Sequence, residues 1–210
     1  MTYLLDACQS VGQMPVRVDE IGCDILSTTG RKYLRGPRGT GLLYVRRELC
    51  QQLEPPFLDL HAATWVTPDR YEITQGARRF ENWECNVAGK VGLGVAIDYA
   101  MSWGLEAIWC RVRMLATHLR DSLRAIPGVS VQDIGAEQCG IVTFTIAGKD
   151  AAAIQETLAE QAINVTISTV TSTRFDMEAR GLTEVVRASV HYFNDENEIE
   201  RFCDVVGSRT

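Results

Sequence analysis

The sequence has few lysines, no long apolar run and no excess of positive charge. Its only lysines are Lys32, Lys90 and Lys149, so arginine supplies most of the positive charge. No apolar stretch approaches the roughly 20 residues that cross a bilayer, and residues 1–6 lack the charged and apolar regions of a signal peptide. The net charge of -6 gives no electrostatic reason to expect nucleic acid or an anionic membrane as a partner. We therefore expect a cytoplasmic protein with neither kind of partner.

Signals for disulfides, metals and mononucleotides are absent as well. The seven cysteines are odd in number, scattered, and form no C-x-x-C pair. They are Cys8, Cys23, Cys50, Cys85, Cys110, Cys139 and Cys203. This pattern indicates reduced thiols rather than a disulfide framework or a zinc site, so we expect no metal. The glycine-rich turn at 36–41 is not a P-loop, because no Lys-Ser or Lys-Thr follows it.

Length and composition are those of an ordinary globular protein. With 210 residues, 46% apolar and 23% charged, the chain can bury one large core or two smaller ones. A mostly apolar helix is predicted over 86–101, where Gly89, Gly92 and Gly94 permit close packing. Gly104 then breaks the pattern, and we place a domain boundary there, giving domains 1–103 and 104–210.

Residues after the boundary alternate between helical and strand periods. An amphipathic helix is predicted over 105–126, with Arg120 and Arg124 among the residues on its polar face. Strands follow at 129–131, 141–146, 163–167 and 185–192, separated by a helix at 151–161 and a Thr/Ser-rich loop at 168–180. Asp150 is expected to cap the middle helix, and a closing helix covers 194–206. This order predicts an α+β domain. Residues 57–75, in contrast, show no clean period.

Polar side chains follow three short apolar runs near the start of the chain. The runs cover 3–5, 23–26 and 42–45, and we expect each to be a strand. In open α/β sheets, ligands bind at strand ends and in the loops that follow them. The side chains delivered there are Asp6, Gln9, Thr29, Arg31 and Lys32.

The spacing of these residues resembles the class V aminotransferase family of pyridoxal-phosphate (PLP) enzymes, which includes cysteine desulfurases and adopts fold type I. The matching pattern is D-x-x-Q-S from Asp6, T-G-R-K ending at Lys32, and G-P-x-G-x-G over 36–41. The resemblance implies an α/β fold, in which part of a PLP-binding large domain, a mainly parallel sheet with helices, precedes a C-terminal small α+β domain. It covers nearly all of this chain but only the C-terminal part of a full family member.

The same resemblance assigns roles to the strand-end residues. Lys32 is implied as the catalytic residue that carries the cofactor as an aldimine, with Asp6 as partner of the pyridinium nitrogen. A carboxylate suits that role because it keeps the pyridine protonated, so the ring can accept electrons from a substrate carbanion. Gln9 is implied to bond the ring hydroxyl, and Thr29 and Arg31 to hold the phosphate. Taken singly, such residues are more often turn, cap or solvated residues.

Further site residues are suggested later in the chain. Val-Arg-Ala-Ser at 186–189 resembles the family's substrate-carboxylate motif, with Arg187 as the matching arginine, and a guanidinium suits bidentate binding of a carboxylate. The alternative is a solvated strand arginine. The resemblance also makes His61 and Trp65 candidates for lining the cofactor pocket, and the alternative is that they only pack the loop. Glu84 stands where desulfurase-like members have a threonine that reaches the neighbouring subunit's phosphate, and an acid there repels the phosphate, so that contact is not expected unless Arg78 or Arg79 compensates.

The resemblance implies a PLP-dependent enzyme acting on an amino acid through the Lys32 aldimine, of the aminotransferase or C–S lyase type, and a homodimer. Residues 167–181 match the loop that carries a sulfur-accepting cysteine in desulfurases, yet they contain no cysteine. A persulfide at that position is therefore not expected, whereas transamination, C–S cleavage and epimerisation stay open. The alternative is a truncated, non-catalytic fragment, because the N-terminal portion that family members carry is not matched, or a partner-dependent subunit, because the first predicted strand would be an exposed sheet edge.

Overall fold

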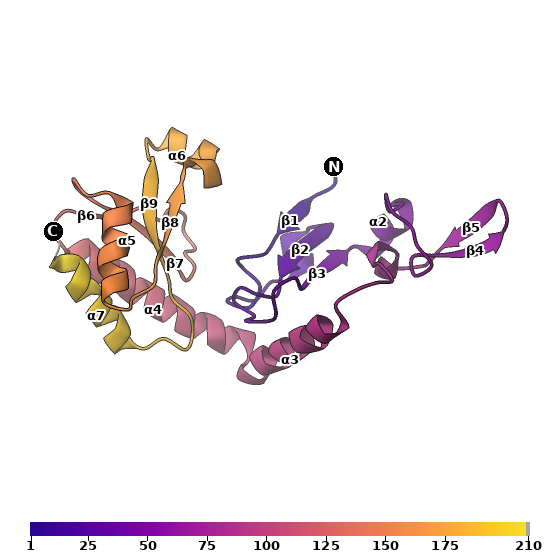
Figure 1. The fold of residues 1–210 in the computed structure, drawn as a ribbon, viewed down its shortest axis with the longest axis horizontal. Coiled ribbons are helices and arrows are strands. Elements are labelled where there is room, and N and C mark those ends of the chain that lie inside the picture. The colour runs from indigo at the N-terminus through magenta and orange to yellow at the C-terminus, as the bar shows by residue number, and fades with distance from the viewer. Residues whose placement is uncertain (209–210) are drawn as a thin grey trace. The chain divides into compact units, whose positions relative to one another are not determined.

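The computed structural model describes residues 1–208 and divides into two compact units, Met1–Leu105 and a second unit that starts at Glu106 (Figure 1). Both strands and helices occur in each unit, so the chain has an α/β fold. Within the described residues, none of the helices combines the length and the apolar character needed to span a membrane.

The first unit is built on a three-stranded sheet of order β1-β2-β3. Its strands are β1 (Leu4–Asp6), β2 (Ile25–Thr29) and β3 (Gly41–Val45), and the short helix α1 (Val18–Ile21) lies between β1 and β2. β1 and β2 are parallel, whereas β2 and β3 are antiparallel. The sheet is therefore mixed rather than mainly parallel, because residues 30–40 contain no crossover helix and β3 returns along β2.

The rest of the first unit contains a hairpin where the sequence showed no period. After α2 (Arg47–Gln52) come β4 (Ala63–Thr67) and β5 (Arg70–Ile73), which form a two-stranded antiparallel sheet, and then the 3-10 helix η1 (Ala77–Phe80). Most hairpin residues are exposed on both faces. A hairpin that buries neither face has no need of an apolar alternation, so the period-2 signal is missing.

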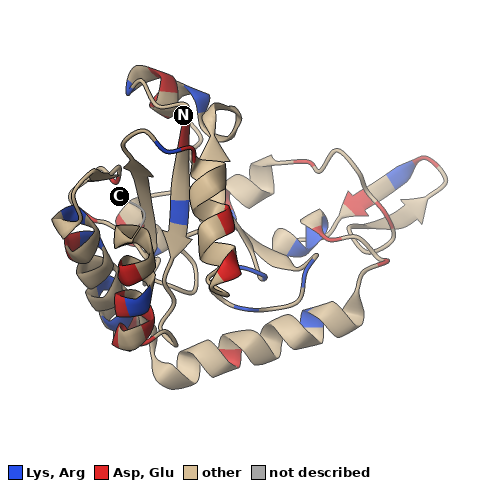
Figure 2. Ribbon diagram, turned by 60° about the vertical axis from the view of Figure 1, so that its left-hand side comes forward, with Lys and Arg blue, Asp and Glu red and all other residues tan. Residues whose placement is uncertain are grey.

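Helix α3 (Val87–Trp103) packs closely on the loop after β2. A Cβ added at Gly89 would lie 3.0 Å from Thr40 Cγ2, and one at Gly92 would lie 2.8 Å from Pro37 Cγ. These two glycines therefore permit the contact, as predicted, but Gly94 has no atom near its Cβ position and does not take part. Figure 2 shows α3 as an almost uncharged helix.

The second unit is a four-stranded antiparallel sheet covered on one face by helices (Figure 1). The strands β6 (Val129–Val131), β7 (Ile141–Ile146), β8 (Thr166–Thr169) and β9 (Glu184–Ser189) have the order β6-β7-β9-β8. β9 lies between β7 and β8, which helix α5 (Ala151–Glu160) connects, so the unit contains a split βαβ motif. Its core is formed by Val142, Phe144, Val186 and Ala188 of the sheet with apolar residues of α4 (Leu105–Ala125), α5 and α7 (Glu196–Gly207).

Two predicted bounds in the second unit, those of a strand and of a loop, differ from the structure. Ile163, Val165 and Ile167 do pack against the core, but β8 begins only at Thr166. The carbonyl of Val165 accepts a hydrogen bond from the Gln155 side chain instead of from a strand. The expected loop at 168–180 also contains η2 (Val170–Ser172) and helix α6 (Arg174–Ala179).

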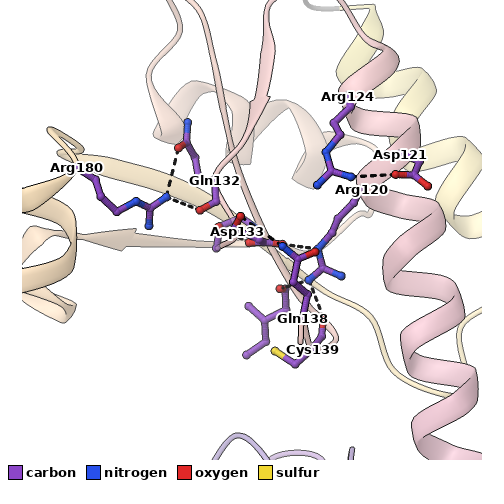
Figure 3. A network of polar contacts seen from close by, with 10 residues as sticks. Arg120, Asp121, Arg124, Gln132, Asp133, Gln138, Cys139 and Arg180 are labelled. Atoms are coloured by element: carbon purple, nitrogen blue, oxygen red, sulfur yellow. Dashed lines mark hydrogen bonds and ion pairs between the residues drawn. The ribbon is translucent and has the colours of Figure 1, made fainter. Parts of the chain in front are cut away.

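The ends and faces of the helices differ from the predicted pattern in two places. Asp150 precedes α5 but makes no side-chain cap; the carboxylate of Glu184 accepts the Ala151 N–H instead, at 2.6 Å. Arg120 was placed on the polar face of α4, yet it is 3% exposed and its Nε donates to Asp133 Oδ2 at 2.6 Å (Figure 3). Both partners lie outside the helix concerned, so helical periodicity carries no information about them.

Candidate functional site

Asp6 ends β1 at the edge of the first unit's sheet. In the parallel register Asp6 pairs with Ser27, so β1 and β2 end near each other. Asp6 Oδ1 accepts the Cys8 N–H at 2.9 Å. Hydrogen bonds from the Cys8 thiol and then from its N–H lower the pKa of Asp6, and the positive charge of Lys32 adds to this effect. Asp6 is therefore held as a carboxylate within electrostatic reach of Lys32.

Cys8 lies beside Asp6, although its residue pattern suggested no role. The hydrogen bond to Asp6, followed by burial, raises the pKa of the Cys8 thiol. The Lys32 charge and the backbone N–H of Thr29 act in the opposite direction, so both lie near the sulfur. Its place two residues after Asp6 was the only available signal, because a residue in that position can turn back to the carboxylate.

The loop that carries Lys32 is fixed by backbone hydrogen bonds on both sides. Gly30 N–H donates to Thr40 O at 2.8 Å, and Gly36 N–H donates to Gly30 O at 2.7 Å. A Cβ at Gly30 would lie 2.4 Å from Thr40 Oγ1, so a larger residue there would force Thr40 to shift. Tyr33 and Leu34 are buried next to the half-buried Lys32. The lysine therefore projects from an anchored segment.

The turn that contains Gln9 packs directly against the Lys32 loop. Gly12 has a φ of 94°, and a Cβ there would lie 2.6 Å from the backbone nitrogen of Leu34. Gln13 is 1% exposed, and its side-chain amide donates to the Gln9 carbonyl. The turn after β1 and the loop after β2 consequently form one packed layer at the strand ends.

The two predicted phosphate ligands differ in exposure. Thr29 is half-buried, and its hydroxyl donates to Thr40 O at 3.3 Å. Arg31 is exposed on the loop. The structure thus gathers Asp6, Thr29 and Lys32 around Cys8, with Gln9 in the adjacent turn. The individual roles predicted for Gln9, Thr29 and Arg31 stay predictions.

Arg187 belongs to the second unit and occupies the middle of β9. It pairs with Thr143 of β7 on one side and with Thr166 of β8 on the other. Its neighbours Val186 and Ala188 are buried in the core, so Arg187 lies on the opposite face of the sheet. That face is polar, because Gln132 Nε2 donates to Thr145 Oγ1 there. Arg187 therefore lies on a rigid central strand with threonines on both sides.

Arg79 does not offer the replacement contact that the sequence suggested for Glu84. It is 5% exposed, and its guanidinium donates to the carbonyls of Cys50, Leu53 and Thr74. Two of these carbonyls lie at the C-terminal end of α2, where helices leave acceptors unsatisfied. Arg79 is thus committed to holding η1 against α2.

The two candidates for the cofactor pocket, His61 and Trp65, follow the strand-end residues in the chain. Their surroundings differ from each other. Trp65 is 70% exposed on the β4–β5 hairpin. His61 Nε2 lies 3.5 Å from a carboxylate oxygen of Glu81 and 3.3 Å from a guanidinium nitrogen of Arg78. Throughout residues 1–208, no three or more His, Cys, Asp and Glu side chains are grouped so that they could hold a metal ion.

Comparison with known proteins supplies a family. The family model for aminotransferase class-V matches residues 1–202. A probable cysteine desulfurase from Methanothermobacter thermautotrophicus is 33% identical over 201 residues, which are 94% of this chain and 50% of that protein. The chain thus spans about half the length of the curated relatives it matches.

Solved structures give the same result. The apo structure of a cysteine desulfurase from Thermococcus onnurineus NA1 has a TM-score of 0.92 and 29% identity, over 99% of this chain and 52% of that one. The cystine C–S lyase C-DES, solved with its product cysteine persulfide, has a TM-score of 0.80 and 25% identity, over 95% and 50% of the two chains. A variant of C-DES was solved with glycine covalently linked to its PLP cofactor. Since the family model matches nearly the whole sequence, this chain belongs to the class-V aminotransferase family.

Proposed function

We propose that this chain is part of a PLP-dependent enzyme that acts on an amino acid, with Lys32 as the residue that binds the cofactor. The observation that carries the proposal is that Asp6, at the end of β1, and Lys32, in the loop after the adjacent parallel strand β2, lie within electrostatic reach of each other. Membership of the class-V aminotransferase family supports it.

The residues present fit the chemical groups of PLP. Asp6 offers a carboxylate whose lowered pKa keeps it charged, as a protonated pyridine nitrogen requires. Lys32 offers an amine for the aldehyde, and Gln9, Thr29 and Arg31 offer polar groups for the ring hydroxyl and phosphate. When bound, the cofactor supplies an electron sink for a carbanion at the substrate's α-carbon. Lys32 would also carry the α-proton, and Arg187 would bind and orient the α-carboxylate.

The reaction class is of the aminotransferase or C–S lyase type. Several similar proteins are cysteine desulfurases and one is a cystine C–S lyase, which makes sulfur-containing amino acids the first substrates to test. Residues 167–181 contain no cysteine, and they form part of β8, η2 and α6. We therefore assign sulfur release, if it occurs, to a route that does not use a cysteine of this segment.

We assign residues 1–103 to part of the large domain and 104–210 to the C-terminal small domain, in a homodimer. The all-antiparallel sheet of the second unit and its own core support the division into two domains. A second candidate is a subunit that needs another polypeptide, with which the half-length match to relatives is compatible. Sedimentation separates the two, because a clean monomer at micromolar concentration would contradict the homodimer.

Reductive trapping tests the proposed cofactor site. The chain is incubated with PLP, reduced with borohydride and mapped by peptide mass spectrometry; we expect the label on Lys32. Lys90, whose ammonium lies 3.4 Å from Glu81, and Lys149 serve as internal controls. Lys90→Ala should leave the labelling unchanged and Lys32→Ala should abolish it. Label on Lys90 or Lys149 instead of Lys32 would refute the assignment.

A substrate titration tests the role of Arg187 separately. Arg187→Ala should leave trapping at Lys32 intact but weaken amino-acid binding, since losing a charge-assisted bond costs on the order of 2 kcal/mol, about thirtyfold in affinity. Arg187→Lys should recover only part of the loss, because an ammonium lacks the bidentate fork. Binding is followed by the change in cofactor absorbance. Equal affinities for wild type and Arg187→Ala would return Arg187 to a structural role.

A further inference from the structure

The loop that carries Lys32 contains a residue in a disfavoured backbone conformation. Arg35 has a φ of 58°, and among the described residues only Ala162 shares a positive φ without being a glycine. Glycine adopts this left-handed region without a steric penalty, whereas a residue with a Cβ does not. Such outliers persist where the surrounding structure holds them, and they concentrate at functional sites. The side chain of Arg35 should therefore have a use that glycine cannot supply.

That side chain reaches helix α3. The Cζ atom of Arg35 lies 5.1 Å from the centre of the Tyr99 ring, within the range of a cation–π contact. Tyr99 in turn makes an edge-on contact with Trp103, at 6.4 Å between ring centroids. Contacts from the Trp103 side chain and, second, from Arg35 lower the pKa of the Tyr99 phenol. All three residues lie in the first unit.

The backbone of Arg35 closes the segment on which Lys32 sits. Arg35 N–H donates to Lys32 O at 2.8 Å, and the next residue, Gly36, donates to Gly30 O at 2.7 Å. A Cβ on Gly36 would lie 3.0 Å from Leu93 Cδ1, so this part of the loop already touches α3. The guanidinium on Tyr99 adds a second attachment to the same helix, six residues further along.

We propose that Arg35 and Tyr99 form a clasp that positions the Lys32 loop on α3, and that both are positioning residues for the lysine. The effect of the clasp on catalysis rests on the proposed function of Lys32. The contact between Arg35 and Tyr99 does not depend on that function. Closing the loop at two points along α3 restricts the backbone from which the lysine projects. A free-moving loop would present the amine in more orientations, and reaction at a fixed aldehyde carbon would be slower.

The clasp is tested first without any cofactor, by amide hydrogen exchange resolved by NMR at Gly36. A cation–π contact at an exposed site corresponds to a change of about two- to fivefold in the closed population. Tyr99→Leu should therefore speed exchange at Gly36 by about that factor, and Tyr99→Phe, which keeps the ring but loses the phenol's hydrogen bond with Arg35, should speed it less. Arg35→Gly should speed exchange although it relieves the disfavoured φ. Exchange in Tyr99→Leu equal to wild type would overturn the clasp.

The link to Lys32 is then tested by reductive trapping with PLP and borohydride in the same variants. Tyr99→Leu and Arg35→Gly should lower the rate of labelling at Lys32 about two- to fivefold, measured in each sample as the labelled fraction of the Lys32 peptide. Tyr99→Phe should label at a rate between those of wild type and Tyr99→Leu. Faster exchange at Gly36 with an unchanged rate at Lys32 would refute the positioning role. Absence of Lys32 labelling in the wild type would instead refute the proposed function and leave the exchange result standing.

Discussion

Replacing Arg120 by methionine should destabilise the second unit more than any surface change on the same helix. Arg120 Nε donates to Asp133 Oδ2 at 2.6 Å, and its Nη2 donates to Cys139 O at 2.7 Å and Ile141 O at 3.0 Å. Asp133 also accepts the N–H of Thr143, at 2.8 Å. The two charged side chains are 3% and 9% exposed. Methionine keeps much of the packing of the stem but removes every one of the guanidinium bonds (Figure 3).

The size of the effect follows from what is left behind. Removing one partner of a buried ion pair leaves an uncompensated buried charge and costs about 3–5 kcal/mol. Two backbone carbonyls also lose their charged donor. A domain of this size has a total stability of about 5–15 kcal/mol, so the variant would lose a large fraction of it. Asp133 binds the N–H of Thr143 in β7, and Thr143 pairs with Arg187 in β9. The loss of stability should therefore extend to both strands.

Native-state hydrogen exchange of the β7 and β9 amides measures this loss in the second unit alone. Arg120→Met should speed their exchange by about a hundredfold or more, since every 1.4 kcal/mol is roughly tenfold. Arg124→Met is the matched control on the same helix, because its 2.9 Å pair with Asp121 is exposed and worth about 0.2–1 kcal/mol. Similar exchange rates in the two variants would refute the reasoning that burial, not pairing, sets the cost.

Three further outcomes are expected. Glu184→Ala should destabilise the chain by about 1 kcal/mol in urea unfolding because it removes the cap of α5, whereas Asp150→Ala should be nearly neutral; the reverse order would contradict the cap. Gly12→Ala should lower the free energy of unfolding by about 3 kcal/mol or more. Gly39 has a positive φ but no atom within 4 Å of its Cβ position, so Gly39→Ala should lower it by only about 1 kcal/mol. Equal losses of stability would refute the close contact at Gly12. Burial raises the pKa of the Cys203 thiol to about 11, so at pH 8 only about one molecule in a thousand carries the thiolate. Iodoacetamide at pH 8 should therefore label the exposed cysteines well before Cys203, and labelling at the same rate would contradict this pKa.

Local patterns in the sequence determined the helices and strands whose buried residues recur at a regular spacing. The apolar residues of α4 recur at three- and four-residue steps and are buried, and the core-facing residues of β7 and β9 alternate as predicted. The pattern from Asp6 to Lys32 indicated the family that the family model then matched. These signals are readable because each depends on residues a few positions apart or on a fixed motif spacing.

Tertiary structure alone decided the contacts between residues that are distant in sequence. Arg120 carries a polar side chain at a helical position that the period places outside, and only the position of Asp133 thirteen residues later makes its burial tolerable. Glu184 caps α5 from 33 residues away. The clasp between Arg35 and Tyr99 joins a loop to a helix that begins 52 residues after it. No local period encodes such pairs, because the chain must fold before the two side chains meet.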